Sequence, residues 1–207
     1  MNPILKRRLA ALNYQDPEAM LRRLMPIIVG ILQKPETVAH LSGKQKNDFL
    51  EEHQAAFLAF MMKHIAGRHA RVTVCVEELD DFDCIIKGEI GKDTVYKPVQ
   101  LKQLPSHEVN DDVELQEIID KLKRKYPTSP DLVVAIWINR DIKLDFTLLR
   151  FDGLKIEQLW FFGDGVTGEI TLDGGIIADL ISGVRWSGIM KDGIPTVRPI
   201  RFKPKFA

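Results

Sequence analysis

The spacing of apolar and polar positions divides the chain into helix-like and strand-like segments. Apolar residues recurring every three to four positions predict helices at residues 3–12, 16–33, 44–66 and 111–125. Alternation predicts strands at residues 71–77, 82–90 and 96–104, and a continuous apolar run at 132–138 predicts a strand covered on both faces. The turns between the first three strands are short, so we expect an antiparallel meander.

Several helix ends carry residues that favour a start or a stop. Asp16-Pro17-Glu18 places an N-cap residue, a proline at the first helical position and an acid in the first turn. Gly67 ends the helix at 44–66. Asp111, with Glu114 three residues later, resembles a capping box and predicts that the last of these helices starts at residue 111.

The last third of the chain predicts short strands separated by glycine-rich turns. Strands are expected at residues 156–162, 169–172, 184–190 and 194–200, with a turn at 163–168 and a short helix at 175–182. This part is therefore expected to be β-rich.

Composition indicates an ordinary soluble globular protein, because the 207 residues are 45% apolar and 28% charged. Two cysteines, Cys75 and Cys84, form neither a disulfide scaffold nor a metal framework, which favours a reducing cytoplasm. The start of the chain lacks a continuous apolar signal segment. The longest apolar run, residues 24–32, is too short to span a membrane. We expect a cytoplasmic protein without a membrane partner.

The net charge is zero, but the charge is unevenly spread. Residues 1–46 carry +5, residues 47–190 carry −9 and residues 191–207 carry +4. Basic ends around an acidic middle are consistent with arms that contact phosphates and a middle that binds a cation. Ordinary surface charge explains the same distribution equally well.

A small group of polar residues falls on the predicted second and third strands. Asp83 lies near the start of one, and Gln100 and Lys102 share one face of the other, because side chains in a strand alternate. A hairpin would bring an acid, an amide and an ammonium group together. Taken singly, each residue is more often structural or solvated. On the preceding helix, Glu51 lies at the edge of the buried stripe and Glu52 nearly opposite it, so Glu51 is the candidate to reach the hairpin.

The order helix, three strands, helix, strand, with Asp83 on the second strand and Gln100-x-Lys102 on the third, resembles the PD-(D/E)XK nuclease superfamily over about residues 45–140. Phe82 stands where a proline is common, and Gln100 replaces the usual acid, as in the Mrr-like branch. The resemblance implies an α/β fold with a restriction-endonuclease-like core and a mixed sheet. Residues 1–43 would form an N-terminal helical extension, 44–140 the core and 141–207 a C-terminal β-rich part of the same domain.

The resemblance also implies a function, the hydrolysis of phosphodiester bonds in DNA with Mg²⁺ or Mn²⁺. The implied metal ligands are Asp83, the side-chain oxygen of Gln100 and the backbone carbonyl of Leu101, with Glu51 as a further ligand. Lys102 would position or activate the attacking water. A neutral Gln100 removes one negative charge and predicts weak metal affinity. Many such nucleases act as dimers, so a homodimer is compatible with the resemblance.

Two other functions fit the same residues. One is a nuclease-fold protein without catalysis that binds nucleic acid or a protein partner. The other is an interaction or oligomer-forming domain that uses the apolar helix around residues 27–32. Asp81 is the alternative to Asp83 as the acid of the site.

Overall fold

The computed structural model describes residues 3–77, 82–107, 109–139 and 149–164, together with the backbone of strands 174–179, 184–191 and 194–201. Contacts divide the chain into two compact units, residues 1–101 and 102–207, and each unit is described by itself. The predicted boundaries at residues 43 and 140 stay predictions.

The first unit begins with helices. They are α1 (Pro3–Ala10), α2 (Pro17–Gln33), the short 3-10 helix η1 (Pro35–Val38) and α3 (Gly43–Ala66). The predicted cap at Asp16 is confirmed, because its carboxylate accepts hydrogen bonds from the backbone N–H groups of Glu18 and Ala19 at 3.0 and 3.1 Å. Ser42 and Gln45 form a capping box at the start of α3. None of the helices within the described ranges combines the length and apolarity that crossing a membrane requires.

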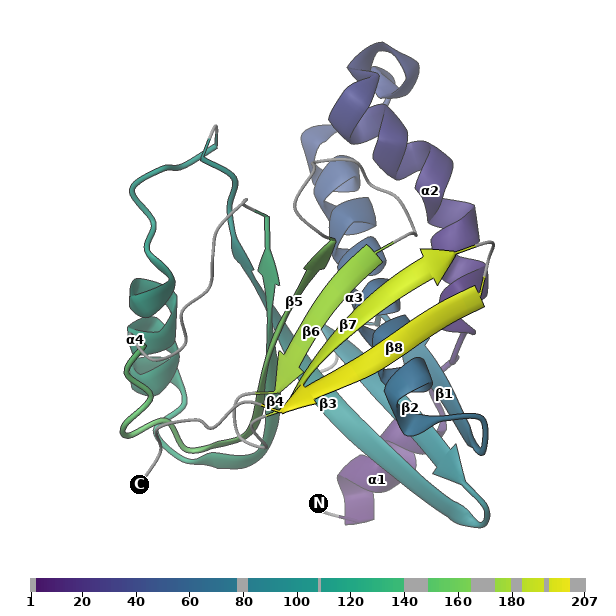
Figure 1. Ribbon diagram of the computed structural model, residues 1–207, viewed down its shortest axis with the longest axis vertical. Coiled ribbons are helices and arrows are strands. Elements are labelled where there is room, and N and C mark those ends of the chain that lie inside the picture. Colours follow the sequence, from purple (N-terminus) through teal and green to yellow (C-terminus); the bar gives the residue numbers. More distant parts are fainter. Residues whose placement is uncertain are drawn as a thin grey trace. The chain divides into compact units, whose positions relative to one another are not determined.

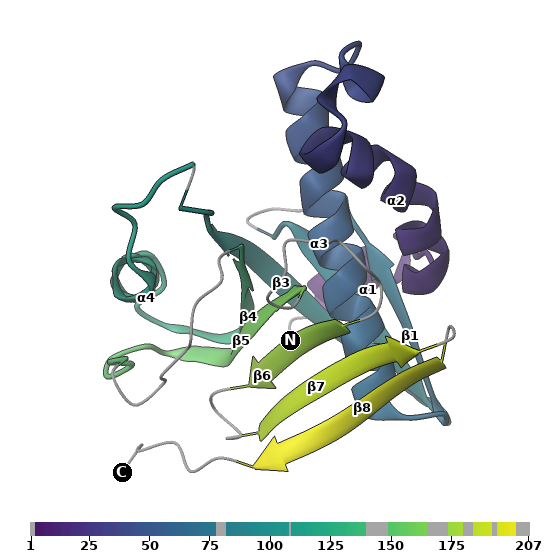
Figure 2. The ribbon, with the colours of Figure 1, turned by 45° about the horizontal axis from the view of Figure 1, so that its top comes forward.

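Helices α2 and α3 lie side by side (Figure 2). Glu52 on α3 forms an ion pair with Arg23 on α2, and Lys63 pairs with the cap residue Asp16 at 2.8 Å. The first of these pairs holds the half-buried Glu52 side chain toward α2.

Three strands follow α3 and form the predicted antiparallel meander (Figure 1). They are β1 (Ala70–Cys75), β2 (Cys84–Ile90) and β3 (Asp93–Leu104). Cys75 lies opposite Ile85, and Cys84 lies opposite Val99. Gly91, at the turn between β2 and β3, has a φ of 61°, a conformation that glycine adopts without a steric penalty.

Each face of this meander carries buried side chains. On one face, Leu9 of α1 packs against Ile85 and Tyr96. The opposite face carries the buried side chains of Val72, Val74, Ile86 and Val99. Helix α3 packs along β1, so α1 and α3 cover opposite faces of the same strands.

The second unit contains the end of β3, helix α4 (Leu115–Lys125) and strands β4 (Ser129–Ile138) and β5 (Ile156–Asp164). Strands β4 and β5 are parallel. Strands β6 (Gly174–Asp179), β7 (Val184–Lys191) and β8 (Ile194–Arg201) continue from β5 in antiparallel order. The chain is therefore an α/β protein with mixed strand directions, and the predicted order of helix, three strands, helix and strand is confirmed.

Two predictions about helices are wrong, one in where a helix starts and the other in the kind of element. Helix α4 begins at Leu115 rather than at residue 111, and Glu114 makes no side-chain capping bond. Asp111 instead pairs with the His107 ring, and the Asp112 N–H donates to the Asn110 side chain at 3.2 Å. These local side-chain bonds hold a turn in place of a helical start.

The second error concerns residues 175–182, which were predicted to be helical. Residues 174–179 form strand β6, paired with β5 on one side and β7 on the other. The β-branched pair Ile176-Ile177 suits this position, where ladder bonds are available on both sides. The strand predicted at 169–172 lies outside the described residues, and β5 extends through Asp164 into the predicted turn.

Candidate functional site

Asp83 and Gln100 lie together at the end of the β2–β3 hairpin that is away from its turn, as the alternation of the sequence predicts. This end is called the open end. Asp83 lies in a bend just before β2, and its backbone N–H donates to the Val99 carbonyl at 3.0 Å. The register that pairs Cys84 with Val99 places Gln100 across from Asp83. Residues 17 positions apart in the sequence thus meet at one point.

The Asp83 carboxylate is bound to β3 through one of its oxygens. Its Oδ2 accepts a hydrogen bond from Nε2 of Gln100 and another from the backbone N–H of Leu101, the latter at 2.6 Å. Strand β2 has not yet begun at this level, so the carboxylate supplies the acceptor for the Leu101 N–H in place of a main-chain carbonyl of β2. Gln100 is only 4% exposed, and burial fixes its side chain against the acid.

Mg²⁺ binds oxygen ligands, so the oxygen atoms near Asp83 decide whether this end of the hairpin suits the ion. In a strand, the N–H and C=O groups of one residue face the same neighbour. The Leu101 carbonyl therefore faces the side on which Asp83 lies, so both residues present oxygen atoms, the donor type that Mg²⁺ prefers. The Gln100 side chain directs its amide nitrogen toward Asp83. A hydrogen-bond donor in this position orients the carboxylate. The predicted role of Gln100 as an oxygen ligand stays a prediction.

Glu51 on α3 lies near the same end of the hairpin. Burial raises the pKa of the Cys84 thiol, and the charges of Asp83 and Glu51 raise it further, so both carboxylates lie within electrostatic reach of that sulfur. Cys84 belongs to the face that α3 covers, whereas Gln100 shares its face with Tyr96 under α1. Glu51 is exposed and belongs to α3, the helix that packs along β1.

Lys102 follows Gln100 by two positions on β3 and is half-buried. It falls in the second unit, and its role stays a prediction. Asp81 lies outside the described residues. Among the residues that are described, no group of three or more His, Cys, Asp or Glu side chains could hold a metal ion. The predicted ligand set has two carboxylates and depends on the Leu101 carbonyl and an amide oxygen for the rest.

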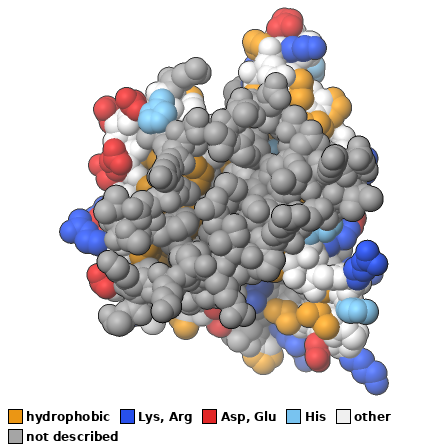
Figure 3. Space-filling view, viewed as in Figure 1, with side chains coloured by type: hydrophobic (Ala, Val, Ile, Leu, Met, Phe, Trp, Pro, Cys, Tyr) orange, Lys and Arg blue, Asp and Glu red, His pale blue; other side chains and the backbone are white. Residues whose placement is uncertain are grey.

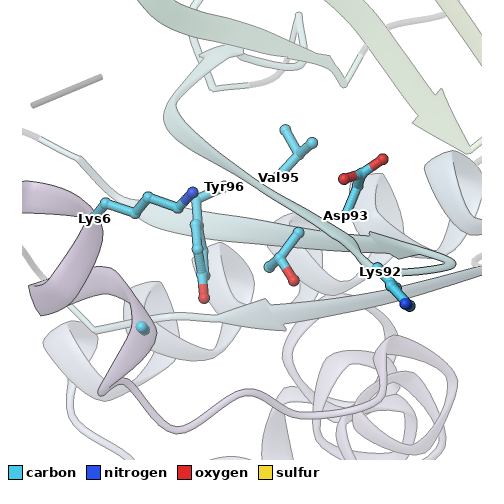
Figure 4. Close-up of a pocket in the computed structure, with 7 residues that line it drawn as sticks. Lys6, Lys92, Asp93, Val95 and Tyr96 are labelled. Atoms are coloured by element: carbon cyan, nitrogen blue, oxygen red, sulfur yellow. The ribbon is translucent and has the colours of Figure 1, made fainter. Parts of the chain in front are cut away.

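The structure adds one feature that the sequence did not indicate. A hollow of about 650 Å³ lies between α1 and the turn end of the hairpin, lined by Lys6, Ala10, Lys92, Asp93, Thr94, Val95 and Tyr96 (Figure 4). The basic run Lys6-Arg7-Arg8 is visible in the sequence, but its place beside a turn some ninety residues away comes only from the packing of Leu9 on Tyr96.

Comparison of the chain with models of protein families, with curated proteins and with solved structures found no match. Any functional assignment therefore rests on the order of elements and on the contacts at the open end of the hairpin.

Proposed function

We propose that this chain is a metal-dependent nuclease of the restriction-endonuclease-like type that hydrolyses phosphodiester bonds of DNA. The observation that carries the proposal is the binding of Asp83 to Gln100 and Leu101 at the open end of the hairpin. The order α3, β1, β2, β3, α4, β4 is the one expected of that fold and supports the same function.

In the proposed reaction, water attacks the phosphorus, the bond to one ester oxygen breaks, and the products are a phosphate monoester and a free hydroxyl. Mg²⁺ or Mn²⁺, when bound, would polarise a phosphoryl oxygen and lower the pKa of the water. Asp83 and the Leu101 carbonyl would hold the ion. Gln100 would keep the carboxylate in place, and the resemblance gives Lys102 the task of positioning the attacking water.

The second candidate is a nuclease-fold protein that binds nucleic acid or a protein partner without cleaving it. The favouring observation is that Asp83 also has a complete structural role. Its Oδ2 accepts the Leu101 N–H just before β2 begins, so the acid has a role in strand pairing without any chemistry.

Cleavage of plasmid and single-stranded DNA in Mg²⁺ or Mn²⁺ separates the two candidates. Asp83→Ala and Lys102→Ala should each lower the rate by about 100-fold or more. Glu89→Gln, on the same strand β2 but away from the open end, is the matched control and should retain activity. Activity that survives both alanine changes would exclude the site. Salt-dependent DNA binding by the wild type without cleavage would favour the second candidate.

A further inference from the structure

We infer that the hollow between α1 and the turn end of the β2–β3 hairpin holds the phosphate backbone of a nucleic acid, without reading its sequence. This inference rests on the proposed function for the presence of a nucleic acid, but it uses none of the residues proposed for metal binding. All the residues that line the hollow belong to the first unit.

The cations at this hollow differ from their neighbours. Arg71 and Lys87, on the adjacent strands, both pair with Glu89, at 3.8 and 2.8 Å. Lys6 and Lys92 form no ion pair with any of the described residues. A charge that has no internal partner remains available to an anionic ligand.

The basic character extends beyond the two lysines. Lys6, Arg7 and Arg8 are consecutive and exposed on α1. Basic side chains stand out at the lower right of Figure 3, where the hairpin turn lies in Figure 1. Asp93 is the acid among the residues that line the hollow. Cations therefore outnumber acids around it.

The spacing of the cations favours a polymer over a free phosphate. Figure 4 shows Lys6 extending along β3 to Tyr96, whereas Lys92 projects from the turn. Lys92 lies in the turn before β3, and Lys6 reaches β3 near Tyr96, which is three positions beyond the first residue of that strand, about 10 Å. A strand of nucleic acid that runs from the turn toward α1 would meet Lys92 and then Lys6.

The lining also indicates the kind of recognition. Tyr96 is only 9% exposed, so its ring is not available to stack on a base. The groups that remain accessible are ammonium and guanidinium groups, which bind phosphates irrespective of sequence. We therefore expect non-specific, salt-dependent binding at this surface.

The test is fluorescence anisotropy of labelled duplex and single-stranded DNA in EDTA, across a range of salt concentrations. Lys6→Ala and Lys92→Ala should each reduce the slope of log K against log salt by about 0.9 on duplex, and weaken binding by about tenfold at 0.1 M salt. Asp93→Asn should instead strengthen binding by about twofold, because it removes a repulsive charge. Lys34→Ala, at an exposed position after α2, is the matched control and should change neither quantity.

Opposite effects of the lysine and aspartate changes, with no effect of the control, would support the inference. Wild-type affinity in both lysine variants would overturn it, and so would an equal loss in Lys34→Ala, which would indicate a diffuse charge effect. Competition by inorganic phosphate at concentrations equal to that of DNA phosphate would also overturn it, since a free anion would then suffice.

Cleavage measured in parallel separates the two proposals. DNA cleavage that depends on Asp83 but not on Lys6 or Lys92 would leave the proposed function intact and remove only this surface.

Discussion

At the open end of the β2–β3 hairpin the Asp83 carboxylate lies against a buried amide, whereas at the turn end Lys92 and Asp93 stand without ion-pair partners among the described residues. Both ends belong to the same two strands. The difference follows from burial, because a polar group removed from water needs a hydrogen-bond partner and an exposed one does not. Polar changes at the open end should therefore affect stability, and those at the turn end should affect chiefly binding.

The largest effect of burial is expected on α3. His53 is 4% exposed, and burial lowers its pKa from 6.5 to about 4. The unfolded chain binds a proton at this residue below about pH 6.5, and the folded chain does so only below about pH 4. The contribution of His53 to stability is thus complete above pH 6.5 and is lost as the pH falls toward 4, by about 3 kcal/mol.

Urea unfolding between pH 7 and pH 4 would measure this loss. His53→Gln should flatten the pH dependence, whereas His40→Gln, at an exposed position, should leave it unchanged. Parallel curves for the wild type and the His53 variant would show that another group is responsible.

The next effect is at the open end itself. Gln100→Leu removes the amide that donates to Asp83 and should lower the free energy of unfolding by about 2 kcal/mol. With Asp83→Ala already present, the same change should cost much less, because the acid is gone. Equal costs of Gln100→Leu in the two backgrounds would mean that the bond between these side chains contributes nothing to stability.

The smallest effect is expected at the turn end. Gly91 has a φ of 61°, and a Cβ built there would meet nothing within 4 Å, so Gly91→Ala should cost only the conformational penalty, about 1 kcal/mol. Gly88→Ala, in an equally open place but without a positive φ, is the matched control. A shift in thermal midpoint for Gly88→Ala as large as that for Gly91→Ala would exclude backbone conformation as the cause.

Local patterns were sufficient for much of the fold. Helical spacing and caps predicted α2 and α3, and alternation predicted the meander, because these signals depend on neighbours within a few residues. The same patterns failed at residue 111, where His107 and Asn110 hold a turn, and at β6, where pairing with β5 and β7 outweighs local preference. Pairing partners far apart in sequence leave no short-range signal.

The sequence by itself determined which residues meet at the open end of the hairpin. Strand alternation and a tight turn place Asp83 across from Gln100, whatever else the chain does. Only the tertiary structure decided that Gln100 directs its amide nitrogen toward the acid and that α1 forms a hollow with the turn end. These features depend on how helices pack on the two faces of the strands, and packing is set by the whole buried surface rather than by any one segment.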